Sequence, residues 1–515
     1  MVKEIEITLA PEELHNEKLI TQLILQDLRI KASELNEYSI LKRSIDARSK
    51  KVVFRLKVQI ATHNDSLETK ILQFRYADVS AQKEVYIIGA GPAGIFAALR
   101  LIELNLKPIV IERGKDVKDR RRDLATLNKD LILNPESNYC FGEGGAGTYS
   151  DGKLYTRSTK RGDVDRILQR FIDHGAEPDI AINTRPHIGT NKLPQIIQSL
   201  REKIIACGGE FHFNTKLTDI EIESNEIKSI TLNGDVKIKT NKVILATGHS
   251  ARDIYYLLHR KNILIEAKPF ALGVRIEHPQ SIIDQSQYKC EIRPNELPPA
   301  YYNIVEQVNG KGVFSFCMCP GGIIAPCATD FNEVVVNGWS PSKRNNRFAN
   351  SGLVVQIDLS DIADAANNPL AALEYQSAVE RLAYQHANNS IKAPAQRIVD
   401  FVNHKVSSDL PENSYLPGLT SANLHEVLPL HVSSRLKQAL PVFGKKMKGY
   451  FSNEGILVGV ESRTSSAVRI PRDRETFEHV QVKGLYPCAE GAGYAGGIVS
   501  AAIDGEKCAE ALARA

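Results

Sequence analysis

The sequence predicts an α/β protein: a doubly wound, Rossmann-like dinucleotide-binding domain split in the sequence, an inserted α+β substrate lobe and a small N-terminal α+β domain. Three observations lead to this prediction. A glycine-rich turn at residues 89–94 separates an apolar run from a helical pattern, a second glycine-rich segment follows residue 484, and the intervening sequence changes character. The expected domains are residues 1–80 (N-terminal), 81–267 (dinucleotide-binding domain, first part), 268–440 (inserted lobe) and 441–515 (C-terminal return).

The composition is that of a globular chain with several domains. Its 515 residues are 43% hydrophobic, which is enough for a large core. The formal net charge of +4, from 65 basic and 61 acidic residues, gives no global reason to expect nucleic acid or a membrane as partner. The N-terminal segment lacks the apolar stretch of a signal peptide, and no apolar run approaches the roughly 20 residues of a membrane span. We therefore expect a cytoplasmic protein without a membrane partner.

The eight cysteines have none of the paired spacings of zinc sites or dithiol motifs, so no metal site is expected. The sequence does not predict an oligomeric state.

Residues 1–80 are expected to form a separate unit. A strand over residues 4–9 precedes a helix with apolar residues at helical spacing, and residues 52–60 alternate between apolar and polar. Seven basic residues and one acidic residue lie between positions 42 and 57, which would suit an anionic partner such as RNA. We favour a solvated sheet face, because Phe54, the one aromatic residue of this run, is expected to point inward.

Residues 89–94 (Gly-Ala-Gly-Pro-Ala-Gly) are the strongest local motif. They follow the apolar residues 85–88 and precede a helical stretch and a second strand that ends on Glu112. In this βαβ layout the first glycine permits the turn, the second lets the backbone approach a pyrophosphate, and the third lets the helix pack closely on the strand. Glu112 stands where a ribose hydroxyl needs an acceptor. The motif therefore predicts a dinucleotide site.

The following residues continue the doubly wound pattern. A crossover helix is expected over residues 193–205 and a strand over residues 210–213, followed by three short strands and a last strand over residues 242–248. Strands mixed with a helix over residues 369–386 characterise the inserted lobe.

Two remote segments are expected to meet the same ligand. Residues 246–248 end a strand on a small, sharp turn, and residues 484–497 are rich in glycine and precede a helical stretch. Residues 491–496 also satisfy the GxGxxG pattern, but the chain ends before a further strand could supply a ribose acceptor. One stably bound dinucleotide is therefore predicted.

Together these segments resemble the FAD-binding fingerprints of the glutathione-reductase-like flavoprotein superfamily. The resemblance implies one tightly bound FAD, with Glu490 at the ribityl chain. It also implies that the helix beginning at Gly497 and Ile498 points its N-terminus at the pyrimidine edge of the flavin. A helix N-terminus stabilises the charge of a reduced flavin there by roughly 0.3–2 kcal/mol.

Nearly the whole chain resembles a family of bacterial proteins labelled NAD(FAD)-utilising or FAD-dependent dehydrogenases. The segments that carry the resemblance are residues 42–48, 141–154, 186–190, 268–279, 315–322, 459–466 and 484–497. Ala489 departs from the family pattern, which has glycine there, and this change is expected to alter packing only. The glycine-rich loop 141–154 is expected to cover the isoalloxazine ring; the alternative is a surface lid without ligand contact.

The resemblance implies an FAD-dependent oxidoreductase that transfers a hydride between flavin N5 and a small molecule, with NAD(P)H as a transient donor. Two alternatives remain: an RNA-modifying or RNA-binding flavoprotein that uses the basic N-terminal face, and a protein that holds FAD for structure or sensing. The residues expected to contact FAD are Gly89, Gly91, Pro92, Ala93, Gly94, Glu112, Arg113, Gly145, Gly147, Ser150, Gly152, Lys153, Thr247, Gly248, Glu490, Gly497 and Ile498.

The sequence offers three catalytic candidates and singles out none of them. His187, in a loop before a helix, suits a general acid, although a hydrogen-bonding role is favoured. Arg463 suits a substrate carboxylate or a reduced flavin, and Glu461 and Arg463 fit a structural ion pair equally well. Cys317 and Cys319 are expected as two buried thiols on one face of a strand; the alternative is a redox pair.

Overall fold

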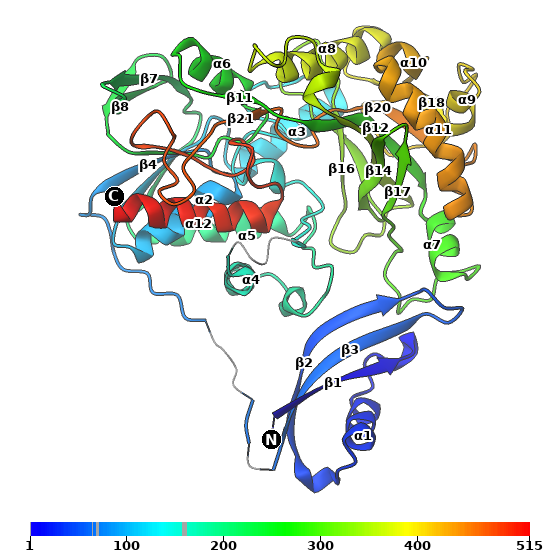
Figure 1. Cartoon of the computed structure of the whole chain (residues 1–515). Helices are drawn as coiled ribbons and strands as arrows, with labels where there is room; N and C mark the ends of the chain where they lie inside the picture. Colours follow the sequence, from blue (N-terminus) through cyan, green and yellow to red (C-terminus); the bar gives the residue numbers. More distant parts are fainter. Residues whose placement is uncertain (1, 64, 68–71, 157–161) are drawn as a thin grey trace.

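The computed structural model describes residues 2–63, 65–67, 72–156 and 162–515. Figure 1 shows a small N-terminal sheet beside two larger α/β bodies, and the helix α12 (Ile498–Arg514) lies across the first of these bodies. No helix within the described ranges is long and apolar enough to cross a membrane.

The N-terminal unit is a three-stranded antiparallel sheet with one helix on it. The strand order is β1 (Val2–Leu9), β3 (Val53–Thr62), β2 (Leu35–Asp46), and α1 (Glu17–Leu28) packs on one face. Phe54 is buried. The sequence did not predict β2, because most of its residues are half-buried or exposed and its apolar alternation is weak. Short 3₁₀ turns, η1 (Pro11–Glu13) and η2 (Ala32–Glu34), flank α1.

A five-stranded parallel sheet forms the centre of the dinucleotide-binding body, as the sequence predicted for an α/β fold. Its strand order is β22 (Leu485–Pro487), β10 (Val243–Leu245), β4 (Glu84–Ile88), β5 (Lys107–Ile111), β6 (Glu210–His212). The helices of this body are α2 (Pro92–Glu103), α3 (Val117–Asp130), α4 (Val164–Asp173), α5 (Leu193–Ala206), α6 (Arg252–Arg260) and α12. An antiparallel meander is inserted before β10, formed by β7 (Leu217–Glu223), β8 (Glu226–Leu232) and β9 (Val236–Lys239).

The second lobe is built on a seven-stranded sheet that is antiparallel except at one edge pair. The strand order is β13 (Ile304–Val308), β14 (Lys311–Cys319), β17 (Phe348–Ile357), β12 (Phe270–Pro279), β20 (Ile456–Glu461), β18 (Ala393–Arg397), β19 (Leu419–Ser421). Its helices are α7 (Gln280–Tyr288), α8 (Ala371–His386), α9 (Ile398–Val402), α10 (Leu424–Val427) and α11 (Leu430–Lys446).

Several short elements complete the chain. Two strand pairs, β15 (Ile323–Pro326) with β16 (Val336–Trp339) and β11 (Glu266–Ala267) with β21 (Val468–Arg469), lie outside the main sheets. The remaining 3₁₀ turns among the described residues are η3 (Gly145–Gly147), η5 (Pro178–Ala181) and η6 (Leu359–Asp361).

The sheet of the second lobe extends beyond the boundary expected at residues 440/441. The strand β20 lies between β12 and β18, so this sheet reaches Glu461. All six residues of β20 are buried, and the apolar residues 456–458 and 460 would fit the centre of either sheet. Only the strand pairing in the folded protein shows which sheet β20 belongs to.

The cysteines of β14 do not form a buried pair on one face. The register of β14 shifts between Phe316 and Cys319, and Cys317 has φ +49°. Cys317 is exposed whereas Cys319 is buried. The expectation of two buried thiols was wrong, because a bulge interrupts the alternation of side chains on which it depended.

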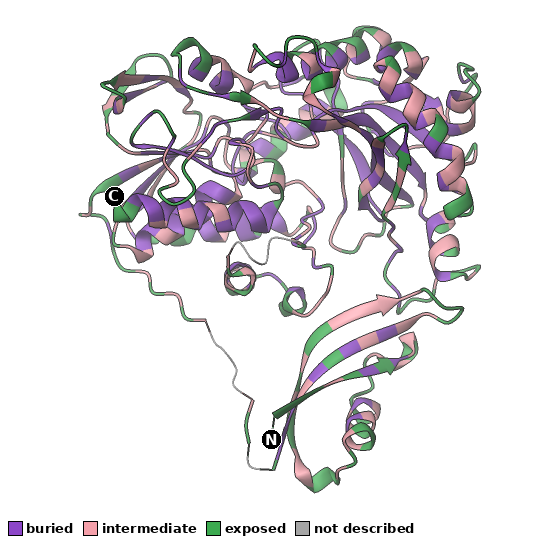
Figure 2. Cartoon of the chain, viewed as in Figure 1, coloured by how far each residue is buried: buried purple, intermediate pink, exposed green. Residues whose placement is uncertain are grey.

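The helix α12 packs closely on α2. Figure 2 shows that both helices are largely buried. At Gly505 an added Cβ would lie 2.1 Å from the carbonyl oxygen of Ala93. Glycine at this position therefore sets how close the C-terminal helix comes to the helix that follows the dinucleotide turn.

We expect Gly505→Ala to destabilise the protein although alanine favours helices. The gain in helix propensity is about 1 kcal/mol, whereas forcing atoms into a packed contact costs about 1–3 kcal/mol or more. Urea unfolding should show a lower midpoint for Gly505→Ala, and Ala513→Ser on the exposed end of α12 is the control. A midpoint equal to or above that of the wild type would contradict the close packing.

Candidate functional site

A cavity of about 1050 Å³ lies where the dinucleotide-binding body meets the second lobe. The N-termini of two long helices open onto it, α2 through Gly91, Pro92 and Ala93 and α12 through Gly497 and Ile498. The first N–H groups of a helix have no partner within the helix and form the positive end of its dipole. The cavity therefore has two built-in anion-binding positions.

The structure brings nearly all of the residues expected to contact a dinucleotide to this cavity. Every one of them lines it except Gly94. An added Cβ at Gly94 would lie 1.9 Å from the carbonyl oxygen of Gly89, so this glycine permits the contact between α2 and the turn. This is the packing function that the motif assigns to its third glycine.

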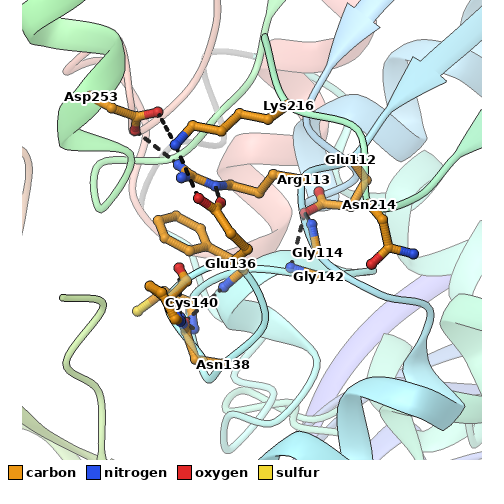
Figure 3. Close-up of polar contacts among 12 residues, drawn as sticks. Glu112, Arg113, Gly114, Glu136, Asn138, Cys140, Gly142, Asn214, Lys216 and Asp253 are labelled. Carbon is orange, nitrogen blue, oxygen red and sulfur yellow. Dashed lines mark hydrogen bonds and ion pairs between the residues drawn. The ribbon is translucent and has the colours of Figure 1, made fainter. Parts of the chain in front are cut away.

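The carboxylate of Glu112, at the end of β5, joins three segments of backbone. It accepts hydrogen bonds from the N–H groups of Ala90, Gly114 and Gly142, each at 2.9 Å. Figure 3 shows Glu112 with two of these donors, Gly114 and Gly142. Glu112 is 5% exposed and lines the cavity. A carboxylate has about four acceptor positions, so three backbone donors leave capacity for one further donor, such as a ribose hydroxyl.

Arg113 belongs to a cluster of four charged side chains beside Glu112 (Figure 3). Its guanidinium lies 2.6 Å from Glu136 and 2.8 Å from Asp253, and Lys216 pairs with the same two carboxylates. The Arg113 guanidinium also stacks 4.2 Å from the ring centre of Phe141. The two cations hold the pKa of Asp253 below its ordinary value although burial alone would raise it. The charge of Arg113 is therefore already balanced within the protein.

The glycine-rich loop over residues 141–154 is anchored to the core of the dinucleotide-binding body. The fully buried Arg120 of α3 donates hydrogen bonds to the carbonyl groups of Asn138, Tyr139 and Glu143 at 2.7–3.0 Å. The N–H of Gly144 donates to the carbonyl of Ala90 in the dinucleotide turn. These bonds place the loop, with its residues 145–147, along the wall of the cavity.

An ion cluster at the end of this loop was not predicted. Asp151, which is 3% exposed, lies 2.8 Å from Arg344 and 3.5 Å from Lys153. Burial alone would raise the pKa of Asp151, but Lys153 and Arg344 lower it well below its ordinary value. Asp151 stands inside the recognisable loop, but Arg344 is remote in the sequence, and no local signal indicates the pairing.

The C-terminal segment contributes Glu490 and the backbone before α12. The carboxylate of Glu490 lies 3.3 Å from Nδ1 of His249, and both residues line the cavity. Ala489 has φ +58°, which glycine adopts freely and which costs an L-residue about 1–2 kcal/mol. The expectation that alanine here alters packing only was wrong, because the position constrains the backbone.

The candidates Glu461 and Arg463 line the cavity, but each is paired with a different partner inside the protein. Glu461 lies 3.0 Å from the fully buried Arg275. Arg463 lies 2.8 Å from Glu333 and 2.9 Å from Glu380. Burial raises the pKa of Glu461 in spite of Arg275. Both candidates therefore lie in structural ion pairs, although not with each other.

The third candidate, His187, does not line the cavity. Its Nε2 lies 3.0 Å from the carbonyl oxygen of Ser342, which agrees with the favoured hydrogen-bonding role. Burial, together with the nearby charge of Arg344, lowers the pKa of His187 from 6.5 to about 4.

The basic run over residues 42–57 is largely ion-paired. Arg43 pairs with Asp179, Arg48 and Arg55 with Asp46, and Lys57 with Glu4. Lys42 differs from these residues because it lines the cavity.

A candidate metal-binding cluster is formed by Cys488, Asp504 and Cys508. The atoms that could coordinate a metal ion lie within 4.8 Å of one another. Arg472 donates two hydrogen bonds to Asp504, at 2.6 and 2.8 Å, so a cation of the protein already balances this carboxylate.

The family assignment comes from a relative of almost the same length. A protein of Clostridium beijerinckii, described as an "Uncharacterized protein", is 40% identical over 514 residues, which are 96% of this chain and 95% of that protein. The chain belongs to the same family as this protein. Residues 269–464 match the family model "FAD-dependent protein, C-terminal domain-like", which supports the expected FAD. Residues 1–61 match a domain of unknown function, DUF8436.

More distant matches include a thiamine thiazole synthase of Aeropyrum pernix, 24% identical over 33% of this chain and 56% of that protein. Among solved structures, glycine oxidase from Geobacillus kaustophilus matches with a TM-score of 0.36 and 11% identity, over 84% of this chain and 95% of that one. The flavin-dependent halogenase CmlS matches with a TM-score of 0.35 and 14% identity, over 84% and 58%. Scores of this size do not establish a shared fold.

We expect His187 to make the protein less stable in acid. The folded state holds the imidazole neutral down to about pH 4, whereas the unfolded chain takes up a proton near pH 6.5. The contribution of His187 is therefore complete above pH 6.5 and is lost as the pH falls toward 4. His187→Gln should lose about 1–2 kcal/mol less unfolding free energy than the wild type between about pH 7 and pH 5.

Urea unfolding at both pH values measures this difference. His15→Gln, at an exposed histidine, is the control and should follow the wild type. Equal losses in wild type and His187→Gln would contradict the lowered pKa.

Proposed function

We propose that this protein is an FAD-dependent oxidoreductase that transfers a hydride between flavin N5 and a small-molecule substrate. The observation that carries the proposal is the single cavity onto which the N-termini of α2 and α12 both open. The cavity volume of about 1050 Å³ slightly exceeds the roughly 300–1,000 Å³ that is usual for small-molecule sites. It therefore suits a dinucleotide together with a small substrate.

The residues present fit the cofactor. Gly91 is the N-cap of α2, and an added Cβ there would have no protein atom closer than 4.0 Å. The space beside Gly91 is thus open toward the cavity, where a pyrophosphate would accept from the first N–H groups of α2. We assign the remaining acceptor position of Glu112 to a ribose hydroxyl and Glu490 to the ribityl chain.

When bound, FAD supplies a two-electron acceptor and donor at N5. The chain contributes placement, exclusion of water and charge stabilisation. The N-terminus of α12, at Gly497 and Ile498, favours negative charge on a neighbouring group by roughly 0.3–2 kcal/mol. The anchored loop over residues 141–154 and the second lobe enclose the reacting atoms, which strengthens such interactions.

We further propose NADH or NADPH as an electron donor that docks transiently beside the flavin, because the second GxGxxG pattern fits the FAD site and not a separate nicotinamide site. The second GxGxxG pattern, residues 491–496, lies between β22 and α12, and its Gly496 lines the same cavity. This segment therefore belongs to the FAD site, and no second stable dinucleotide site is assigned to it.

Gly91→Ala should separate cofactor binding from folding. The protein has room for the methyl group, and Gly91 has φ −74°, so we expect unchanged stability of the apoprotein. The methyl group would obstruct the approach of the pyrophosphate, at a cost of about 1–3 kcal/mol or about 5- to 150-fold in the FAD dissociation constant. Flavin fluorescence titration measures the affinity. Wild-type affinity in Gly91→Ala would contradict the placement of the pyrophosphate.

The proposed activity is tested by anaerobic titration of the FAD-bound protein with NADH and NADPH. We expect one of them to bleach the flavin absorbance rapidly, with turnover once an electron acceptor is added. A correctly folded protein that does not bind FAD would overturn the proposal. A flavin that stays oxidised with both donors would favour a structural or sensing role.

A further inference from the structure

Two cations in the cavity wall have no anionic partner. Lys42 and Arg185 are exposed residues that line the cavity, and within the ranges that the structure describes neither forms an ion pair. Each of the other lysine and arginine side chains of the wall has a carboxylate partner, although Lys153 and Arg344 share that of Asp151. This part of the wall therefore carries an excess of positive charge.

Lys42 reaches the cavity because the N-terminal sheet is docked on the dinucleotide-binding body. The N–H of Arg43 donates to the carbonyl of Ile182 at 2.7 Å, and the N–H of Thr184 donates to the carbonyl of Arg43 at 3.0 Å. Nε of Arg43 also donates to Asn183 at 2.9 Å. The strand β2 thereby pairs with the segment that leads to Arg185. The N-terminal unit thus contributes a side chain to the site.

A bulge in β2 immediately precedes Lys42. The pairing of β2 with β3 shifts between Ile40 and Lys42, which leaves Leu41 without a partner in the ladder. A bulge of this kind turns the next side chain relative to a regular strand. The bulge and the docked Arg43 together account for the place of Lys42 at the cavity. Arg43, Arg48, Arg55 and Lys57 instead pair with acidic residues.

Arg185 is held in place by an aromatic ring and keeps its donors free. Its guanidinium lies 3.5 Å from the ring centre of Tyr301, which also lines the cavity. This cation–π contact fixes the plane of the guanidinium. Among the described residues, no acceptor takes a hydrogen bond from its side chain. A planar fork with free N–H donors matches the two oxygens of a carboxylate or a phosphate.

We propose that Lys42 and Arg185 together bind an anionic group, a carboxylate or a phosphate, of the substrate. The proposal rests on the proposed function, in which this cavity holds the flavin and the substrate. It implies that the N-terminal unit is part of the active site and selects anionic substrates.

The test uses the full-length FAD-bound protein and isothermal titration calorimetry. The probes are benzoate, succinate and inorganic phosphate, with benzamide and succinamide as neutral counterparts of the two carboxylates. The variants are Lys42→Gln and Arg185→Gln. The matched control is Lys51→Gln, which removes an exposed charge from the same hairpin but does not line the cavity.

We expect at least one anion to bind the wild type, a carboxylate more tightly than its amide. Lys42→Gln and Arg185→Gln should each weaken the binding of that anion about tenfold, which is about 1.4 kcal/mol, because each removes a charged hydrogen-bond donor. Lys51→Gln should leave its affinity unchanged, and all variants should retain FAD. Preference for phosphate or for a carboxylate identifies the anionic group.

Two results would overturn the proposal. One is that neither substitution weakens the binding of any of the anions. The other is that the two substitutions weaken the binding of FAD instead, which would place both cations at the cofactor. Failure of the proposed function is distinguishable from both. If the protein does not bind FAD, the proposed function fails. Titration of the apo chain would then still show whether anion binding requires Lys42 and Arg185.

Discussion

The buried carboxylate of Glu112 is the interaction on which the geometry of the site depends. Its three backbone donors come from the dinucleotide turn, the segment after β5 and the glycine-rich loop. A buried carboxylate without such donors would be costly, because burial removes its hydration. The same bonds bring three glycine-rich backbones close together along the cavity. Glu112 therefore holds three backbone segments in place and keeps one acceptor position for a ligand.

A second buried network joins the dinucleotide-binding body to the second lobe. Arg252 of α6 and Arg463, which follows β20, share the carboxylates of Glu333 and Glu380. Glu380 is fully buried, and the two arginines lower its pKa far below the ordinary value although burial alone would raise it. Removing one partner from such a network leaves an unbalanced buried charge and costs about 3–5 kcal/mol. Arg463 therefore has a structural reason for its place beside the cavity, independent of any reaction.

Local patterns predicted much of the fold. The glycine spacing around Gly91 and the apolar runs beside it indicated β4, α2 and β5, because turn geometry and helix packing depend on residues close in sequence. The pattern missed β2, whose residues are mostly half-exposed, and gave no indication that β20 joins the second lobe. Ala489 was recognised as unusual, but only its backbone angle showed why glycine fits that position.

The sequence alone determined the dinucleotide turn and the helix that starts beside it, since local sterics and periodicity specify these features. The residues expected at one cavity followed from the resemblance to flavoproteins. Only the tertiary structure decided which charges are balanced. Glu461 pairs with Arg275 and Arg463 with Glu380, while Lys42 and Arg185 have no anionic partner among the described residues. The physical reason is that an ion pair depends on the distance between side chains remote in the sequence, and that distance is set by how whole sheets pack.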